Sequence, residues 1–331
     1  MQLRAPGPIE ASPLEETTRP APEPGPDELL VRVAACGVCR TDLHIVEGEL
    51  ALPRSPIVPG HQVVGEVEQV GRGATRLGPG QRVGIAWLRW TCGECRFCRN
   101  DRENLCERAR FTGYHADGGY AEYAVVPEAF AYPIPDVFSD AEAAPLLCAG
   151  IIGYRALRRS GVKPGGRLGL YGFGSSAHLT LQVAAARGCE VYVCTREPAH
   201  RALACSLGAA WVGDVADPMP VATDGTIIFA PAGELVPLAL RNLAAGATLA
   251  LAGIHMTKIP PIDYADLYRE RVVTSVTANT RADGEELLAE AARIPIRPVV
   301  TTFPLSAANR VLERLKRGAI AGSGVLVPDR V

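Results

Sequence analysis

Residues 91–106 read TCGECRFCRNDRENLC, a stretch with four cysteines in the spacing C-x2-C-x2-C-x7-C. The four are Cys92, Cys95, Cys98 and Cys106. Thiolates this close together can surround one zinc ion as a tetrahedral S4 site, with zinc–sulfur bonds of about 2.3 Å. Two disulfides and an iron–sulfur cluster are the alternatives. Iron–sulfur motifs usually end on a short gap and a proline, whereas Glu107 follows the last cysteine here. The spacing favours a structural zinc lobe over about residues 90–108.

The composition describes a globular protein with room for more than one core. A chain of 331 residues suits two domains, and 47% hydrophobic residues exclude a disordered chain. A net charge of −2 gives no electrostatic reason to expect nucleic acid or an anionic membrane as a partner. The sequence has no apolar run of membrane-spanning length, and MQLRAPGPIE lacks a signal-peptide core. Ten cysteines in such a chain predict a reducing, cytoplasmic location.

Before residue 150 the chain alternates short β-like runs with Gly/Pro turns, which is typical of an irregular all-β domain. The runs are ELLVRVAACGVC (28–39), HQVVGEVEQVG (61–71), QRVGIAW (81–87) and GGYAEYAVVP (118–127). Residues 1–26 are rich in proline and acid, and we expect an edge strand and a loop there.

From Gly166 onward strands alternate with helices, the pattern of a parallel doubly wound sheet. We expect strands in RLGLYG (167–172), EVYVC (190–194), TIIFA (226–230), ATLALAG (247–253) and VVTSV (272–276). Helices are expected at 175–188, with Ser175 or Ser176 as the cap, at 197–207, and around 234–244 and 262–270. After Ile294 the β pattern returns in PVVTTFPL (298–305) and SGVLVP (323–328), with a helix over 306–317 between them. The expected domains are therefore 1–150, 151–293 and a return segment, 294–331.

The turn YGFGSSA (171–177) carries a dinucleotide-binding fingerprint. Gly172, Gly174 and Ala177 form G-x-G-x-x-A between a strand and a helix, where a pyrophosphate can approach the backbone. An acidic residue at the end of the next strand would indicate NAD(H). Thr195 and Arg196 stand there instead, and a guanidinium beside a hydroxyl suits the 2′-phosphate of NADP(H). The alternatives are a solvated Arg196, or NAD(H) held by Glu197.

A second metal site is suggested by Cys39, His61 and Cys148. Three protein ligands of this kind with an open fourth position are typical of catalytic zinc. Taken alone, each residue could equally be a packed core residue.

The motifs together resemble the zinc-dependent medium-chain alcohol dehydrogenase family over nearly the whole chain. They are GVCRTDLH (37–44), PGHQVVGEV (59–67), the four-cysteine lobe, GGYAEY (118–123), LLCAG (146–150) and the nucleotide turn. The resemblance implies a GroES-like irregular β-barrel catalytic domain and a Rossmann domain, a homodimer or homotetramer, and two zinc ions per chain. Cys39, His61 and Cys148 would bind the catalytic zinc.

The resemblance also implies roles for the residues around that zinc. Asp42 would orient the zinc-binding histidine, and Thr41 and His44 would form a proton relay. Arg40 would contact the cofactor pyrophosphate. Leu50 and Trp87 would line an apolar substrate slot.

Two positions depart from the family pattern. Gln62 replaces the glutamate that commonly follows the zinc histidine, which removes a negative charge near the metal. Ser323 stands where many relatives carry an arginine that reaches the cofactor, so cofactor affinity or release is expected to differ.

The sequence thus predicts reversible hydride transfer between an alcohol and NADP(H), with NAD(H) as the alternative. One rival is a polyol or sugar dehydrogenase of the same superfamily, which would need a more polar pocket wall than Leu50 and Trp87 provide. The other is a non-catalytic, zinc-stabilised nucleotide-binding redox sensor, which would have no need for an open metal position.

Overall fold

The computed structural model describes residues 1–294 and 296–329. Its contacts divide the chain into two compact units. Unit 1 contains Met1–Cys148, Ala278–Ala292 and the chain from Pro298 onward, and unit 2 is built mainly from Ala149–Thr277. Among the described residues, no helix has the length and apolar character needed to cross a membrane.

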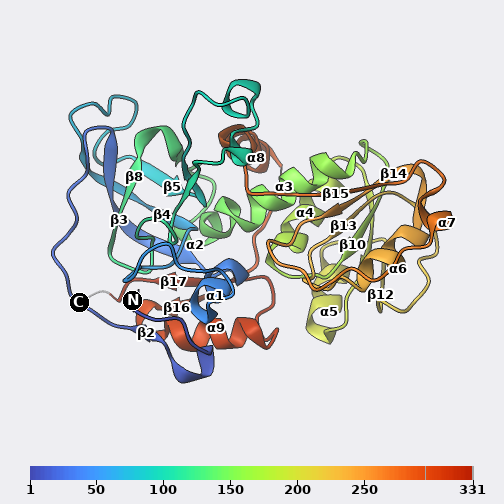
Figure 1. Cartoon of the computed structure of the whole chain (residues 1–331). Helices are drawn as coiled ribbons and strands as arrows, with labels where there is room; N and C mark the ends of the chain where they lie inside the picture. The colour runs from blue at the N-terminus through green and yellow to red at the C-terminus, as the bar shows by residue number, and fades with distance from the viewer. Residues whose placement is uncertain (295, 330–331) are drawn as a thin grey trace. The chain divides into compact units, whose positions relative to one another are not determined.

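Unit 1 is organised around a mixed sheet in which β3 is the central strand (Figure 1). Strand β3 pairs antiparallel with β4, β8 and β17, while β16 and β17 pair parallel to each other. Two bulges in its ladder with β4 bend this sheet, as is common in barrel-like folds. The sheet strands are β3 (Glu28–Gly37), β4 (Val63–Val70), β5 (Arg82–Ile85), β8 (Tyr123–Pro127), β9 (Ala131–Pro133), β16 (Val300–Pro304) and β17 (Ser323–Val327).

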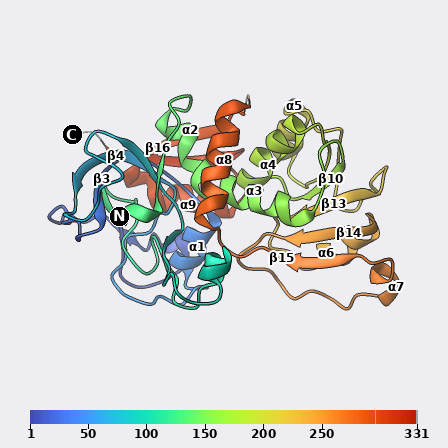
Figure 2. The same cartoon turned by 90° about the horizontal axis from the view of Figure 1, so that it is seen from above.

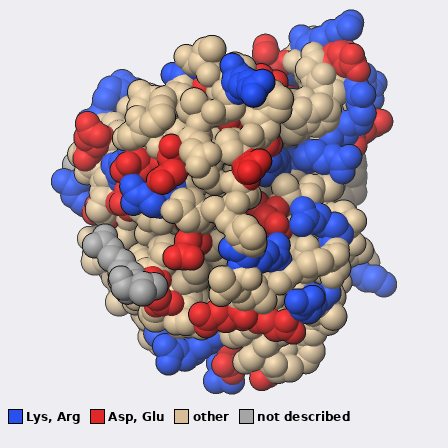
Figure 3. Space-filling view, turned by 90° about the vertical axis from the view of Figure 1, so that its left-hand side faces the viewer, with Lys and Arg blue, Asp and Glu red and all other residues tan. Residues whose placement is uncertain are grey.

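Shorter elements complete unit 1. The small strands pair as β1 (Gln2–Leu3) with β2 (Leu14–Glu15), and as β6 (Leu88–Trp90) with β7 (Arg110–Phe111). The helices are α1 (Arg40–Glu47), α2 (Asp140–Ala143), α8 (Arg281–Arg293) and α9 (Ala308–Lys316). The 3-10 turns are η1 (Ile9–Ala11), η2 (Cys98–Asn100), η3 (Glu103–Leu105), η4 (Glu128–Phe130), η5 (Ala144–Leu147) and η6 (Leu305–Ala307). On the face seen in Figure 3, acidic and basic side chains are interspersed.

Unit 2 is a parallel sheet with strand order β12-β11-β10-β13-β14-β15 among the described residues. Figure 2 shows β15 beside β14, with α7 in the connection that joins them. The strands are β10 (Arg167–Tyr171), β11 (Glu190–Cys194), β12 (Trp211–Gly213), β13 (Thr223–Ile228), β14 (Leu243–Leu251) and β15 (Val272–Ser275). The helices are α3 (Ala149–Ser160), α4 (Ser175–Ala186), α5 (Pro198–Ser206), α6 (Leu235–Arg241) and α7 (Tyr264–Leu267).

The predicted fold class, an irregular β domain with a parallel doubly wound domain, is confirmed. Several details differ from the prediction. Gly174 occupies the N-cap position of α4, so the expectation that Ser175 or Ser176 caps this helix is wrong. Helices α1, α2, α3 and α8 were not predicted. The structure groups most of α8 with unit 1, whereas the sequence boundary at residue 293 placed it in the nucleotide domain.

Candidate metal and nucleotide sites

Three potential metal ligands converge in unit 1. Cys39 is the N-cap residue of α1, His61 precedes β4, and Cys148 follows η5. Their ligand atoms all lie within 4.8 Å of one another. The sulfurs of Cys39 and Cys148 are 3.9 Å apart, and His61 Nε2 is 3.2 Å from Cys148 Sγ.

This geometry fits a tetrahedral zinc centre. Two thiolates on one zinc ion should have their sulfurs about 3.8 Å apart, given zinc–sulfur bonds of about 2.3 Å. The observed 3.9 Å matches that value and is far longer than a disulfide bond of about 2.05 Å. His61 and Cys148 are buried and Cys39 is half-buried, so the centre is largely shielded from water.

Asp42 holds the imidazole of His61 in place. The His61 Nδ1–H donates to Asp42 Oδ1 over 3.0 Å, which leaves Nε2 directed toward the two sulfurs. The Asp42 carboxylate also accepts the backbone N–H groups of Cys39 (2.9 Å) and Gly60 (3.1 Å). Gly60 has φ +96°, and a Cβ there would lie 2.5 Å from the Tyr120 ring, so only glycine fits. The structure therefore contains the pair of Asp42 and His61 that the sequence predicted.

The three potential ligands of this centre shift the pKa values of one another. Burial alone would lower the pKa of His61, but the charge and hydrogen bond of Asp42, together with Cys39, raise it to about 10. Hydrogen bonding to Cys148 lowers the pKa of Cys39, and the same contact raises that of Cys148. One thiol is thus ready to ionise first, and a cation between the sulfurs would favour ionisation of both.

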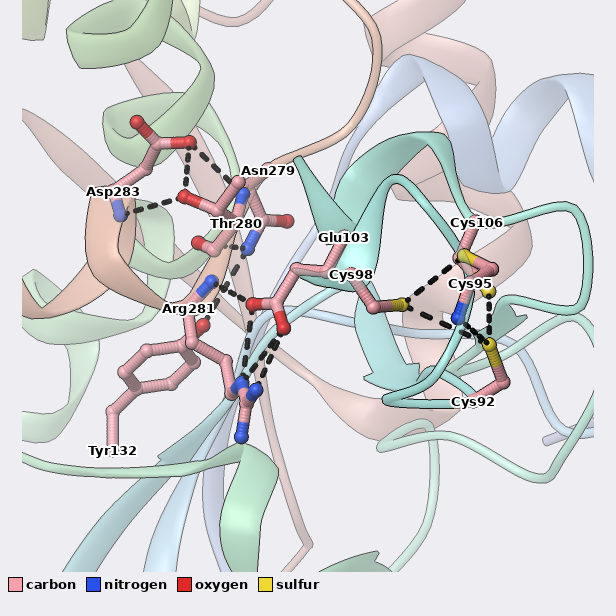
Figure 4. Close-up of polar contacts among 10 residues, drawn as sticks. All are labelled: Cys92, Cys95, Cys98, Glu103, Cys106, Tyr132, Asn279, Thr280, Arg281 and Asp283. Atoms are coloured by element: carbon pink, nitrogen blue, oxygen red, sulfur yellow. Dashed lines mark hydrogen bonds and ion pairs between the residues drawn. The ribbon is translucent and has the colours of Figure 1, made fainter. Parts of the chain in front are cut away.

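The four-cysteine lobe forms a second, separate cluster in unit 1 (Figure 4). Its sulfur–sulfur distances are 3.9 Å for Cys92–Cys98, 3.5 Å for Cys95–Cys98 and 3.6 Å for Cys106–Cys92. These values again match a tetrahedral S4 zinc site and exclude disulfides among the four. Hydrogen bonding, first to the backbone of Glu94, lowers the pKa of Cys92 to about 6.

An aromatic stack borders the Cys39–His61–Cys148 centre. The Trp87 ring meets the His61 ring edge-on at 5.0 Å and stacks on Phe111 at 4.9 Å. Tyr114 stacks on Trp87 at 5.9 Å, and its hydroxyl donates to the Ala51 carbonyl over 2.6 Å. This bond ties the loop that carries Leu50 to the stack, and Leu50 itself packs against the core of unit 1.

Helix α1 presents the predicted relay residues on consecutive turns. Thr41 is buried, and its hydroxyl oxygen lies 3.7 Å from Cys39 Sγ. His44 is buried one turn later and contacts Glu49 Oε2 through Nδ1. Arg40, the first residue of α1, is exposed.

The nucleotide fingerprint in unit 2 has the predicted strand–turn–helix setting. Gly172 follows β10 with φ +84°, and a Cβ there would lie 3.0 Å from the Ala230 nitrogen. A Cβ on Gly174 would meet nothing within 4 Å, so this position is open to a ligand. Ala177 is buried in α4. The open glycine before the first turn of a twelve-residue helix fits a pyrophosphate.

Arg196 follows the end of β11, and Arg201 of α5 bonds back to the same place. Arg196 is exposed, whereas Thr195 is 2% exposed. The Thr195 carbonyl accepts Arg201 Nε over 2.7 Å, and Arg201 also pairs with Asp214 at 2.5 Å. Glu197 lies 3.7 Å from the Nδ1 of His200 at the start of α5.

Three comparisons with known proteins agree on the family. Residues 25–136 match the alcohol dehydrogenase GroES-like domain. The chain is 54% identical to a probable alcohol dehydrogenase of Mycobacterium tuberculosis, over 98% of this chain and 96% of that relative. The chain belongs to the zinc-dependent medium-chain alcohol dehydrogenase family. Membership makes it an oxidoreductase with alcohol dehydrogenase activity.

Solved structures show the same relationship in three dimensions. A cinnamyl alcohol dehydrogenase of Sorghum bicolor superposes with a TM-score of 0.90 at 27% identity, covering 98% of this chain and 97% of that one. A cobalt- and zinc-bound thermostable alcohol dehydrogenase of Pyrobaculum aerophilum gives 0.89 at 28% identity, covering 99% and 98%. The GroES-like and Rossmann assignments are therefore confirmed for this alcohol dehydrogenase.

The two departures from the family pattern are both buried in unit 1. Gln62 is 2% exposed, packs over Gly37 and has an Oε1 without a hydrogen-bond partner among the described residues. Ser323 begins β17, and its backbone N–H donates to the Val299 carbonyl over 2.9 Å. Position 323, where the family resemblance suggested an arginine, therefore holds a buried strand residue.

Sequence reasoning missed Glu49, Tyr114 and Arg201, which the structure joins to His44, Ala51 and Thr195. Glu49 lies five residues after His44. This spacing indicates a contact only if α1 ends between the two residues, and no motif in the sequence predicted that end.

Proposed function

We propose that the chain is a two-zinc, NADP(H)-linked alcohol dehydrogenase or aldehyde reductase. The observation that carries the proposal is the convergence of Cys39, His61 and Cys148 on one point, with His61 held by Asp42. Three such ligands leave a fourth position for substrate. The four-cysteine lobe offers a closed structural site, and the Pyrobaculum aerophilum neighbour is a cobalt- and zinc-bound enzyme.

When bound, zinc would supply Lewis acidity toward an alcohol or carbonyl oxygen, and nicotinamide would exchange the hydride. The chain's own residues position and deprotonate the substrate. Asp42 fixes the His61 ring, and the Trp87 stack excludes water from one side of the centre. The Thr41 hydroxyl can accept the substrate proton and pass on its own, because a hydroxyl both donates and accepts. His44, at the outer end, releases the proton to solvent.

Arg196 is the residue that favours NADP(H). It is exposed directly after β11, where the nucleotide ribose is expected, and a guanidinium binds phosphate through charge-assisted bonds. Gly172, Gly174 and Ala177 would receive the pyrophosphate, with Arg40 as a further contact. Because Thr195 is buried, it would contribute less to nucleotide binding than Arg196. Glu197 would be the residue that binds the ribose if the nucleotide were NAD(H).

The substrate is proposed to be an apolar primary or secondary alcohol, or its aldehyde or ketone. Trp87 and the stacked Phe111 give one wall of the slot an aromatic surface, with Leu50 as the second wall residue. A polyol would leave its hydroxyls unpaired against such walls. A panel of small, branched, aromatic and polyol substrates with both nucleotides distinguishes the alternatives.

We also propose a homodimer or homotetramer in a reducing, cytoplasmic setting. None of the ten cysteines is in a disulfide, which favours a reducing compartment. Strand β15 lies at the edge of its sheet, and exposed Val272, Tyr264 and Tyr268 lie on it or just before it. An exposed strand edge with apolar neighbours suits pairing with a second copy.

Cys148→Ser tests the proposed function. The variant should lose turnover, retain one zinc ion per chain in the lobe, and bind NADPH nearly as the wild type does, because only the catalytic centre loses a thiolate. Metal analysis, steady-state kinetics and NADPH titration are the measurements. Two zinc ions in the wild type favour the enzyme over the redox sensor. Unchanged activity in the variant would contradict the mechanism.

A further inference from the structure

We propose that Glu49 is a positioning residue of the proton relay, whose carboxylate accepts the Nδ1–H of His44 and so fixes the orientation and tautomer of that ring. The inference rests on the proposed function, because it requires that His44 carry the substrate proton. The proposed relay then includes Glu49, which orients His44, in addition to Thr41 and His44.

The backbone after α1 is built to bring Glu49 back to His44. Gly48 ends the helix with φ +81°, a left-handed conformation that glycine adopts without strain. The Leu50 N–H then donates to the His44 carbonyl over 3.2 Å. Because the chain reverses between these two residues, the Glu49 side chain returns to the imidazole. The Tyr114 hydroxyl holds the far side of the loop at Ala51.

The contact decides which ring nitrogen can act. A neutral histidine has one N–H, and a carboxylate at Nδ1 places it there, so Nε2 carries the lone pair that can accept a proton. The proton arriving through Thr41 is then taken up at Nε2, the Nδ1–H bond to Glu49 is kept, and one proton leaves to water. The His44 side chain is 9% exposed and that of Glu49 is 46% exposed, so the carboxylate is the solvent-facing member of the pair.

The other carboxylates near α1 have partners of their own. Arg40 and Glu47 lie one turn before and one turn after His44 on α1, and the elements packed against this helix, η1 and α9, contribute Glu10 and Lys316. Lys316 bridges Glu47 at 2.8 Å and Glu10 at 2.9 Å. Glu49 is therefore the carboxylate that contacts His44, while Glu47 and Glu10 pair with Lys316.

A carboxylate also fixes a histidine ring at the metal centre. Asp42 accepts the Nδ1–H of His61, and Glu49 accepts that of His44. Each carboxylate is placed by a local backbone feature, which is the start of α1 for Asp42 and the end of α1 for Glu49. Such pairing fixes the tautomer and the orientation of each ring.

The test compares Glu49→Gln and Glu49→Ala with the wild-type holoenzyme. Glutamine keeps an acceptor oxygen for Nδ1–H but removes the charge. Without that charge the contact to Nδ1–H is weaker, so kcat/KM for alcohol oxidation should fall about two- to threefold across the pH profile. Alanine also removes the acceptor, and its kcat/KM on the plateau should fall about tenfold. Nitrogen-15 NMR of the imidazole should show the Nδ1–H tautomer in the wild type and a mixture in Glu49→Ala.

Two controls separate the possible failures. Glu66→Gln removes a carboxylate with 49% side-chain exposure from a surface ion pair, and its profile should match the wild type. His44→Ala should reduce kcat/KM, and adding Glu49→Ala to it should have no further effect. If His44→Ala is fully active, the proposed relay fails. If His44→Ala is impaired while both Glu49 variants keep the wild-type profile and tautomer, the role of Glu49 is refuted.

Discussion

Single residues carry most of the chemistry, and the sequence identified those whose neighbours form local motifs. Cys39, Asp42 and His44 lie within six residues, so their arrangement follows from one helix start. The pairing of Asp42 with His61 bridges nineteen positions and was expected from the family resemblance. Glu49 was missed because its contact depends on the reversal at Gly48, which no motif announces.

Arg196→Ala should distinguish the nucleotides. The substitution removes a charge-assisted contact to a 2′-phosphate, so the KM for NADPH should rise roughly tenfold or more while that for NADH changes little. Steady-state kinetics with both nucleotides at saturating alcohol or aldehyde is the measurement. Equal effects on the two nucleotides would refute the phosphate assignment and leave Glu197 as the discriminating residue.

Asp42→Asn should weaken the catalytic zinc. The amide cannot accept all three hydrogen bonds that the carboxylate takes from Cys39, Gly60 and His61. Zinc affinity at the centre should fall by about 10–100-fold, while the lobe keeps its ion. Chelator competition followed by metal analysis measures both sites.

The pH dependence of zinc binding follows from the same pair. In the wild type the pKa of His61 is raised to about 10, so zinc must displace a proton and bind more tightly as the pH rises toward that value. The slope of affinity against pH should be shallower in Asp42→Asn, because the charge that holds the proton is gone. An identical slope in both proteins would contradict this assignment.

At the scale of elements, alternation predicted the long strands well, because a strand buried on one face has to alternate. Strands β3 and β4 fall where the sequence placed them, whereas β14 begins at Leu243, four residues before the predicted start. Helix α8 was missed because it begins with RADGEE, which has few apolar residues. This start therefore shows no hydrophobic periodicity of the kind that predicts a helix. Its start is fixed instead by polar contacts: Thr280 and Asp283 bond reciprocally, and Arg281 reaches Glu103 in η3 (Figure 4).

Glu103→Gln should loosen this anchor. Arg281 donates from its backbone and its guanidinium to Glu103, a carboxylate that is 7% exposed, and the cation is partly screened by water. We expect a loss of about 1–2 kcal/mol in the free energy of unfolding at neutral pH, measured by denaturant titration. Glu94→Gln is the control, since the Glu94–Arg108 pair in the same lobe is exposed and should matter little.

The sign of the pH effect is fixed by the direction of the pKa shift. Burial would raise the pKa of Glu103, but hydrogen bonds and charge from Arg281 lower it overall. A lowered pKa in the folded state stabilises the protein above the unfolded value of 4.5 and loses that effect as the pH falls through the folded value. The difference between wild type and Glu103→Gln should therefore shrink below about pH 4.5. A constant difference would exclude the ion pair as its cause.

At the scale of the whole molecule, the chain builds unit 1 from separated segments, with unit 2 inserted between them. The sequence predicted a return to the first domain because the β pattern resumes after residue 294. In the structure the chain returns to unit 1 earlier, at Ala278. The contact of Arg281 with Glu103 joins α8 to that unit. Long-range polar contacts of this kind leave no periodic trace in a sequence, which explains why hydrophobic patterning placed the boundary too late.

The edge of the unit 2 sheet should decide whether the molecule associates with itself. Val272 in β15 is 48% exposed, and Tyr264 and Tyr268 just before it are 74% and 70% exposed. A lysine on an edge strand opposes edge-to-edge pairing, because its charge would be buried in the interface. Val272→Lys should therefore shift the protein to a smaller species in sedimentation velocity. Val137→Lys, at a position 53% exposed in unit 1, should leave the assembly unchanged. A monomeric wild type, or a Val272→Lys variant that sediments like the wild type, would rule out this edge as the interface.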